Sequence, residues 1–369
     1  MQSVLCYGAI PDGKTDCLVA IQNALKKEKE IYFPSGVYLI TGEILIPSNR
    51  KIVLESDAEI YCADNCFNKS GVRAMITNDD YINGNENIYI EGGKFNGNNK
   101  NNRREDWAKG PNQGLMFSFY NVKNLTVKNA NLYNPESYHI RLGKTTDFLI
   151  ENINITTDFL TPCQDGVHVG GYSHRGVIKN ITAVDGATND DLIAFNADDA
   201  NWYCQNWGME DGSITDMVVD GVYAKNCWTG CRILSVKSLV KNILVKNMEV
   251  GVREMGINFD ATRYCADKIF DEKDYPNGVG NLDNVVFENI KMWRTRELER
   301  TILLLESNGN YEIKNFKRKR ELEPQTTSKT AKTAYLYGSK LTINKKEIAL
   351  NGEETFYDGD SYDIKVEKI

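Results

Sequence analysis

Histidine is scarce in this 369-residue chain, with only three copies, and the nine cysteines form no Cys-x-x-Cys pair. The two closest cysteine pairs are Cys62/Cys66 and Cys227/Cys231. A zinc site needs four ligands, and the three histidines do not supply either cysteine pair with two further ligands at a recognisable spacing. The sequence therefore predicts no metal site and no cofactor.

Long apolar runs and a basic excess are also missing. No stretch of about 18 apolar residues could form a transmembrane helix. Lys plus Arg number 44 against 51 Asp plus Glu, a net charge of −7, which disfavours nucleic acid as a partner. We expect neither a nucleic-acid nor a membrane partner. The N-terminal residues do not resemble a secretion signal, so a cytoplasmic location and export with a removed signal both stay open.

Asparagine, by contrast, occurs 39 times, and much of it falls at regular places between short apolar runs. Each unit reads as a strand of period 2, a polar bend and a second short strand. The bend markers fall at residues 92, 129, 152, 180, 220, 247 and 289. Units of 23 to 28 residues, with longer copies carrying insertions, are typical of a solenoid.

A parallel arrangement of these units explains the asparagines. If each unit is one coil, equivalent strands stack in parallel and the asparagines at the bends form a hydrogen-bonded ladder. A β-propeller is the alternative, but its blades need about 40 residues each. We therefore predict an all-β fold, a single-stranded, right-handed parallel β-helix.

The two ends of the chain differ from the repeats. An apolar stripe at helical spacing predicts a capping helix over about residues 16–27, with Thr15 or Asp16 at its start. The expected organisation is a β-helix domain over 1–310, a polar loop or linker over 311–333, and a small C-terminal β segment over 334–369. The basic run Lys317-Arg-Lys-Arg320 is expected to lie in the solvated linker.

Acidic residues cluster at equivalent positions of two successive coils. Asp165 lies in Cys163-Gln-Asp-Gly-Val-His168, and 25 residues later comes Asn189-Asp190-Asp191. Parallel stacking places equivalent residues about 4.8 Å apart, so the three carboxyl groups should share one patch. Mutual repulsion would raise one pKa enough to keep a proton for general-acid work. Paired carboxylates of this kind hydrolyse glycans, for which a solenoid offers a long groove.

Several segments resemble those of pectin-degrading β-helix enzymes, over roughly residues 4 to 305. Tyr7-Gly-Ala-Ile-Pro-Asp12-Gly and Phe33-Pro-Ser-Gly-Val-Tyr resemble an N-terminal segment that lyases and phage tail proteins share, and Gly93-Lys-Phe-Asn-Gly97 resembles a turn of these enzymes. Asn134-Pro-Glu-Ser-Tyr-His139-Ile-Arg141 resembles the Asn-Ser-Pro-x-Trp-His segment of glycoside hydrolase family 28, the polygalacturonases.

The resemblance implies roles for the acids. That family acts by inversion, using an Asn-Thr-Asp motif and an Asp-Asp motif. Asp165 matches the Asp of the first motif, and Asp190 and Asp191 match the second, so by resemblance Asp190 would be the acid, with Asp165 and Asp191 activating a water. The sequence departs from the family at three places, and in the first of them Cys163-Gln164 stand where the first motif has its Asn. The family histidine of Gly-His-Gly would fall at Gly230-Cys231-Arg232, and its Arg-Ile-Lys clamp for the substrate carboxylate would fall near Gly256-Ile-Asn258-Phe-Asp260. Uronate recognition at the cleavage point is therefore expected to be weak.

Other side chains are candidates for holding the substrate, a polysaccharide or oligosaccharide. His168 follows Asp165 by three residues, with a buried structural histidine as the alternative. Exposed tryptophans after the acids could stack on sugar rings, and nearby cations could hold acidic groups. The candidate substrate-binding residues are His139, Arg141, His168, Trp202, Trp207, Arg232 and Lys237.

Three functions compete for this sequence. The leading hypothesis is an inverting glycoside hydrolase acting on a pectin-like or related glycan. A β-helix lyase or epimerase is the second, although no basic cluster accompanies Asp165 and Asp190 in the sequence. The third is a non-catalytic glycan-binding protein of the phage-tail or surface type.

Overall fold

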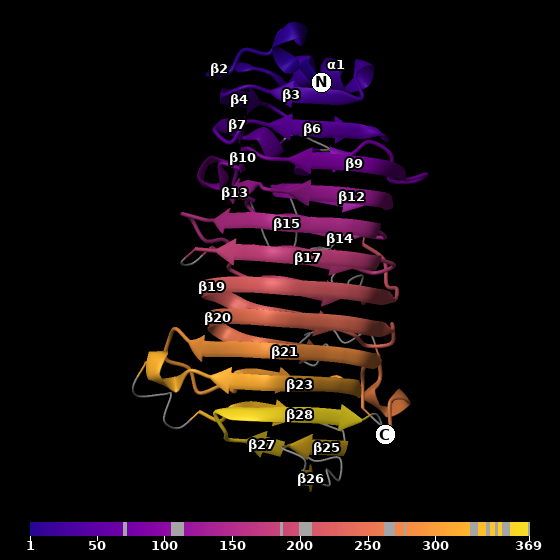
Figure 1. Cartoon of the computed structure of the whole chain (residues 1–369), viewed down its shortest axis with the longest axis vertical. Helices are drawn as coiled ribbons and strands as arrows, with labels where there is room; N and C mark the ends of the chain where they lie inside the picture. Colours follow the sequence, from indigo (N-terminus) through magenta and orange to yellow (C-terminus); the bar gives the residue numbers. More distant parts are fainter. Residues whose placement is uncertain are drawn as a thin grey trace.

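The chain folds into a tall stack of parallel β-coils, which confirms the predicted parallel β-helix (Figure 1). The computed structural model describes residues 1–369 except 69–71, 105–113, 185–186, 199–208, 262–269, 277, 325–330, 337–339, 344–345, 349–354 and 368–369. One face is built by strands that pair in parallel from coil to coil. They are β12 (Val122–Lys128), β15 (Thr146–Thr156), β17 (His174–Ala183), β19 (Ile214–Leu234), β20 (Val240–Asp260), β21 (Leu282–Arg294) and β23 (Gly309–Arg318).

Every second residue of these strands points into the stack, because successive side chains of a strand face opposite sides. Ile150, Ile178, Val219 and Val245 lie directly above one another and are at most 1% exposed. Equal positions in successive coils therefore build one continuous apolar column. The core runs along the whole axis of the molecule.

The bends carry the predicted asparagine ladder. Asn129, Asn152 and Asn180 adopt the left-handed conformation, with φ of 56°, 56° and 54°. Asn152 donates its amide N–H to the Oδ1 of Asn129 at 2.8 Å, and Asn180 donates to Asn152 at 2.9 Å. The register places Gly221 (φ 81°), not Asp220, at the next rung, so the marker assigned to residue 220 was one residue early. Glycine and asparagine both tolerate the left-handed backbone conformation, which explains why a glycine stands at this rung where the coils of Asn129, Asn152 and Asn180 have an asparagine.

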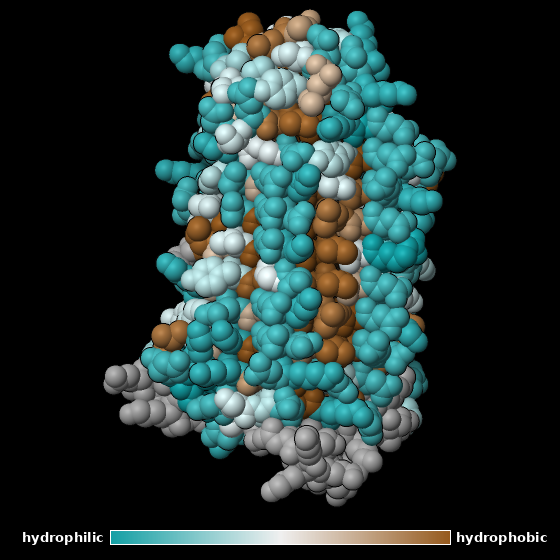
Figure 2. All heavy atoms as spheres, viewed as in Figure 1, coloured by the Kyte–Doolittle hydropathy of each residue, from teal (hydrophilic) through white to brown (hydrophobic). Residues whose placement is uncertain are grey.

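A ladder of alternating charge runs beside the asparagines, and the repeat analysis did not include it. Successive coils place lysine against glutamate or aspartate, as in Lys128–Glu91 (3.4 Å), Lys179–Glu151 (3.5 Å) and Lys246–Asp220 (3.1 Å). Next to it is an apolar stripe, visible in Figure 2, along a face where the register stacks partly exposed aliphatic residues. These residues are Leu149, Val177, Val218, Leu244 and Val286.

The N-terminal end of the stack carries helix α1 (Leu18–Lys27), two residues shorter than predicted (Figure 1). Its buried residues are Ala20, Ile21, Ala24 and Leu25, which are members of the predicted apolar stripe. Among the described residues, no helix is long and apolar enough to cross a membrane.

The C-terminal end departs from the predicted organisation. The stretch expected as a linker, 311–333, begins with strand β23, which pairs in parallel with β21 as a further coil. Arg318 ends this strand with its side chain turned inward, so the basic run is not simply a solvated loop. The small β appendage is confirmed. In it β28 (Ser361–Glu367) pairs antiparallel with both β23 and β25 (Lys340–Ile343).

Candidate active site

A second face of the stack is made of short strands. β11 (Leu115–Tyr120), β14 (Ile140–Gly143), β16 (Val167–Gly170) and β18 (Asp191–Asn196) lie in successive coils, followed by the last residues of β19 and β20. Their registers place polar side chains in one column. In order along the axis, this column contains Thr77, Ser118, Arg141, His168, Ala194, Arg232 and Asn258.

The predicted catalytic acids meet at the edge of this face. The backbone N–H of Gly166 donates to the carbonyl of Asp191 at 2.9 Å, which fixes the coil of Asp165 against that of Asp191. Strand β16 begins two residues after Asp165 and pairs Val167 with Ile193, 26 residues on. The same offset sets Asp165 opposite Asp191, and Asp190 directly precedes Asp191. Gly166 is required here, since a Cβ would lie 2.3 Å from the carbonyl oxygen of Leu192. The three acids therefore lie close together in adjacent coils.

His168, in strand β16, supports Asp165, which lies two residues before that strand. Its Nδ1 lies 2.7 Å from the Oδ2 of Asp165, and both side chains are almost fully buried. The imidazole ring also packs edge-on against Tyr138 at a centroid distance of 4.8 Å. A ring nitrogen that donates to a carboxylate holds that carboxylate in position and favours its ionised form.

Arg232 supplies the positive charge of the cluster. Its Nε donates to the Oδ2 of Asp260 at 3.1 Å, and its Nη1 lies 3.7 Å from the Oδ2 of Asp191. Burial disfavours its charge, but the carboxylates of Asp260, Asp191 and Asp190 outweigh burial and raise the pKa of Arg232. The arginine therefore stays charged and is held by the protein's own acids.

The environment separates the protonation states of the acids. Burial raises the pKa of Asp190 well above its ordinary value, and the neighbouring Asp165 and Asp191 raise it further. Burial likewise raises the pKa of Asp191, to about 7, while Arg232 opposes the rise. An acid that keeps its proton thus stands beside a carboxylate that titrates near neutrality, the combination that acid–base catalysis needs.

These pKa values predict an unusual pH dependence. If Asp191 must be ionised and Asp190 protonated, kcat/KM should rise with pH through about 7 and fall again when Asp190 loses its proton. His139 will not contribute, because burial lowers its pKa to about 4 and it stays neutral in this range. The check is kcat/KM against pH on a substrate for which turnover is detected. An acid limb near pH 4, as for an ordinary carboxylate, would contradict the assignment.

Comparison with known proteins places the chain in a family. The sequence profile described as "Glycosyl hydrolases family 28" matches residues 27–332. The chain belongs to this family. The tomato (Solanum lycopersicum) polygalacturonase-2 is 23% identical over 79% of this chain and 60% of its own length. The solved family 28 exopolygalacturonase of Yersinia enterocolitica superposes with a TM-score of 0.54 at 14% identity, covering 86% of this chain and 78% of that one.

A phage protein is also similar. The pre-neck appendage protein of Bacillus phage B103 is 28% identical over 63% of this chain. The match spans 27% of the phage protein, so this family 28 chain corresponds to about a quarter of that relative. Sequence similarity therefore links the chain both to polygalacturonases and to a phage appendage.

The other predicted site residues fall in different places. His139 is fully buried, with its Nδ1 2.8 Å from the carbonyl of Asp165, so it supports the backbone of that acid and cannot touch a substrate. Lys237 pairs with Asp211 at 3.4 Å on an exposed turn. Trp202 and Trp207 lie outside the described residues.

Cys231, the residue assigned to the family histidine, is fully buried and pairs with Ile193 in the core. Thr229, two residues earlier, is the residue in register with Asp191. Thr229 also hydrogen-bonds Asp191, which lowers the pKa of that acid against the larger effect of burial.

Sequence reasoning missed an aromatic–arginine group beside Asp190. Arg253 donates to the Oδ1 of Asn189 at 3.1 Å and to the carbonyl of Thr188. Its guanidinium lies 5.6 Å from the ring centroid of Trp228, and Arg296 lies 4.8 Å from the same ring. Arg253 thus anchors the turn that precedes the acid. Nothing local in the sequence signals this contact, because coil stacking brings together residues 64 positions apart.

The described part of the chain contains no group of three or more histidine, cysteine or acidic residues arranged to hold a metal ion.

Proposed function

We propose that this family 28 chain is an inverting glycoside hydrolase acting on a pectin-like glycan. The observation that carries the proposal is the pair of registered carboxylates, Asp165 and Asp191, beside Asp190, whose pKa is strongly raised. One protonated and two ionisable carboxyl groups within adjacent coils match the requirement for cleaving a glycosidic bond.

In the proposed reaction Asp190 protonates the oxygen of the departing sugar. Asp165 and Asp191 hold a water on the opposite side of the sugar ring and accept its proton as the water attacks. His168 keeps Asp165 oriented, and the positive charge of Arg232, which lies between Asp191 and Asp260, offsets the repulsion between these two acids. The water's oxygen forms the new bond to the anomeric carbon while the bond to the leaving oxygen breaks.

We predict weak or no activity on plain polygalacturonate. A galacturonate carboxylate at the cleavage point would meet Asp260 where the family has a cation, and Arg232 is engaged with that same acid. Losing such a charged contact costs about 2 to 3 kcal/mol, or roughly 30- to 150-fold in specificity. The measurement compares kcat/KM on polygalacturonate with that on glycans whose sugar at the cleavage point is neutral or substituted. Efficient galacturonate release that disappears in Arg232→Ala would overturn the prediction and identify Arg232 as the clamp.

A glycan panel tests the function itself. New reducing ends support the hydrolase, and products that absorb at 235 nm indicate the lyase alternative. Binding without any product would instead support a non-catalytic glycan-binding role. The non-catalytic alternative is motivated by the similarity to a phage appendage protein over 63% of this chain.

A further inference from the structure

A cavity of about 310 Å³ lies on the same face as the acids, toward the N-terminal end of the stack. Its volume is at the low end of the range of about 300–1,000 Å³ for sites that hold small ligands. The column of registered residues connects the two places, since Arg141 lies one coil from His168, and Ser118 two coils from it. Each coil advances about 4.8 Å. The cavity is lined by Arg73, Tyr81, Ile82, Ser118, Tyr120, Arg141, Lys144 and Glu210.

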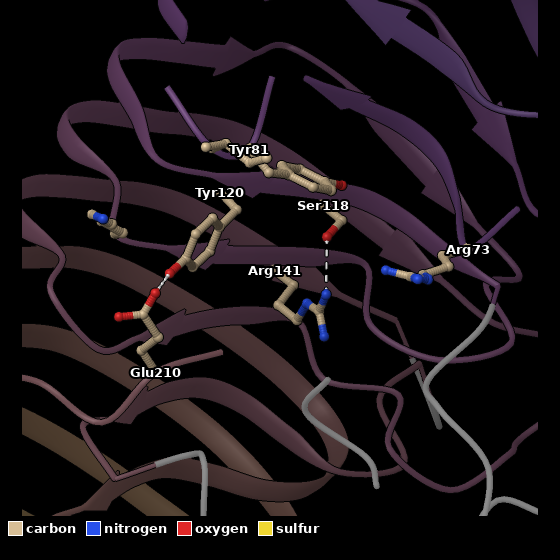
Figure 3. Close-up of a pocket in the computed structure, with 8 residues that line it drawn as sticks. Arg73, Tyr81, Ser118, Tyr120, Arg141 and Glu210 are labelled. Atoms are coloured by element: carbon tan, nitrogen blue, oxygen red, sulfur yellow. Dashed lines mark hydrogen bonds between the residues drawn. The ribbon is translucent and has the colours of Figure 1, made fainter. Parts of the chain in front are cut away.

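Two guanidinium groups face this cavity, as Figure 3 shows for Arg73 and Arg141. Arg141 is only 9% exposed, and its Nη2 donates to the Oγ of Ser118 at 3.3 Å. Its guanidinium also lies 5.8 Å from the ring centroid of Tyr138, the same ring that packs on His168. Arg141 is thus held in a fixed orientation and coupled by packing to the acid cluster.

Arg73 comes from the coil that contains β8 (Ala74–Asn78). Burial lowers the pKa of Arg73, and the negative charge of Glu43 opposes that shift. The Oε1 of Glu43 accepts the backbone N–H groups of Arg73 and Ala74 at 2.6 and 2.8 Å. An anion placed between the two guanidiniums would offset the cost of burying their charge. Planar guanidinium groups match a carboxylate with paired hydrogen bonds.

Aromatic rings form the wall of the cavity opposite these charges. Tyr81 and Tyr120 pack edge to face, with centroids 6.1 Å apart. The hydroxyl of Tyr120 donates to Glu210, which reaches the cavity from the chain segment before β19. A Cβ at Gly143 would lie 2.8 Å from the Tyr120 ring, so this glycine makes room for the tyrosine. Tyrosine rings beside polar acceptors fit the apolar face and the hydroxyl groups of a pyranose.

We propose that this cavity is a subsite for an acidic sugar of the glycan, whose carboxylate lies between Arg73 and Arg141. The proposal rests on the proposed function only in that a glycan runs along this face. It places recognition of the acidic group one to three coils from the coil of Asp165, since Arg141 lies one coil away and Arg73 three coils away, whereas the cleavage point itself is lined by Asp260. The ring of the sugar lies on Tyr81 or Tyr120, and Glu210 accepts its hydroxyl groups.

The test is equilibrium binding by calorimetry in the Asp190→Asn background, so that no turnover interferes. The probes are trigalacturonate and its fully methyl-esterified form, which lacks the negative charges and carries one added methyl group on each carboxyl group. We expect the acid to bind roughly 10- to 100-fold more tightly than the ester, and Arg73→Gln and Arg141→Gln each to remove most of that difference. Arg141→Lys keeps the positive charge but loses the paired hydrogen-bond donors of the guanidinium group. This variant should bind trigalacturonate more weakly than the parent.

Two further variants guard against misfolding. Glu210→Gln removes a negative charge from the cavity and should tighten trigalacturonate binding several-fold, a gain that misfolding cannot produce. Arg175→Gln removes an exposed arginine paired with Asp147 on the other face, and should change nothing. Equal affinity for acid and ester, or unchanged acid binding in both Arg73→Gln and Arg141→Gln, would overturn the subsite. Charge-selective binding by a protein that hydrolyses nothing would uphold the subsite and refute only the proposed reaction.

Discussion

Asp190→Asn should lower kcat by a factor of roughly 10³ or more, with the fold unchanged. The amide cannot donate a proton to the leaving oxygen, and the charge pattern of the cluster is lost with it. Steady-state kinetics on a cleaved glycan, together with circular dichroism, make the measurement. A matched control is Asp147→Asn, which removes an exposed acid paired with Arg175 and should keep full activity.

The same variant has a predicted effect on stability. The folded-state pKa of Asp190 is raised above its unfolded value, so its favourable contribution is present at low pH and is lost as pH rises through the folded pKa. Asparagine carries no such cost at any pH. The Tm of Asp190→Asn should therefore equal or exceed that of the parent at pH 8. An active variant would contradict the assignment of Asp190 as the acid, and a Tm at pH 8 below that of the parent would contradict the predicted effect on stability.

Glu323→Ala should lower the free energy of unfolding by about 3–5 kcal/mol. Arg318 and Glu323 are both fully buried and form two hydrogen bonds of 2.8 Å, and Arg318 also donates to the Oγ1 of Thr333 at 3.0 Å. Truncating the glutamate leaves a buried guanidinium without its counter-charge. Urea unfolding followed by circular dichroism measures the loss.

A neighbouring lysine is the control for this variant. Lys317 is exposed on the same strand, and Lys317→Ala should change the free energy of unfolding by no more than about 0.5 kcal/mol. If Glu323→Ala were as mild as Lys317→Ala, residues 311–333 would behave as the solvated linker that composition predicts. The structure instead places the buried ion pair of Arg318 and Glu323 in this part of the chain.

The contrast shows which features the sequence can predict. The β-helix was predictable because its bend imposes a left-handed backbone at one place per coil, and asparagine is among the few residues that tolerate it. The apolar residues on either side then fix the strands. Arg318 occupies the next inward position of the same strand pattern, after Tyr311, Ile313 and Phe316. From the sequence alone a charged residue is predicted to be exposed, because the sequence does not show that Glu323 lies beside Arg318.

The candidate site was predictable to the same extent. One-coil spacing brought Asp165 to the Asp190–Asp191 pair, with Asp191 as the registered partner. That Thr229 lies in register with Asp191, two residues before Cys231, was not predicted, because the sequence does not show how these two strands pair. The cavity was missed because its residues, from Arg73 to Glu210, come from separate coils and become neighbours only in the stack.

The stereochemistry of the first product tests the central claim most directly, that three carboxyl groups cleave the bond with a water and no covalent intermediate. Proton NMR of a cleaved glycan, recorded within the first minutes before mutarotation, reports the anomeric configuration of the new reducing end. The account predicts inversion, because Asp165 and Asp191 hold the attacking water opposite Asp190. Net retention would mean that one of these acids attacks the sugar itself, and would contradict the account.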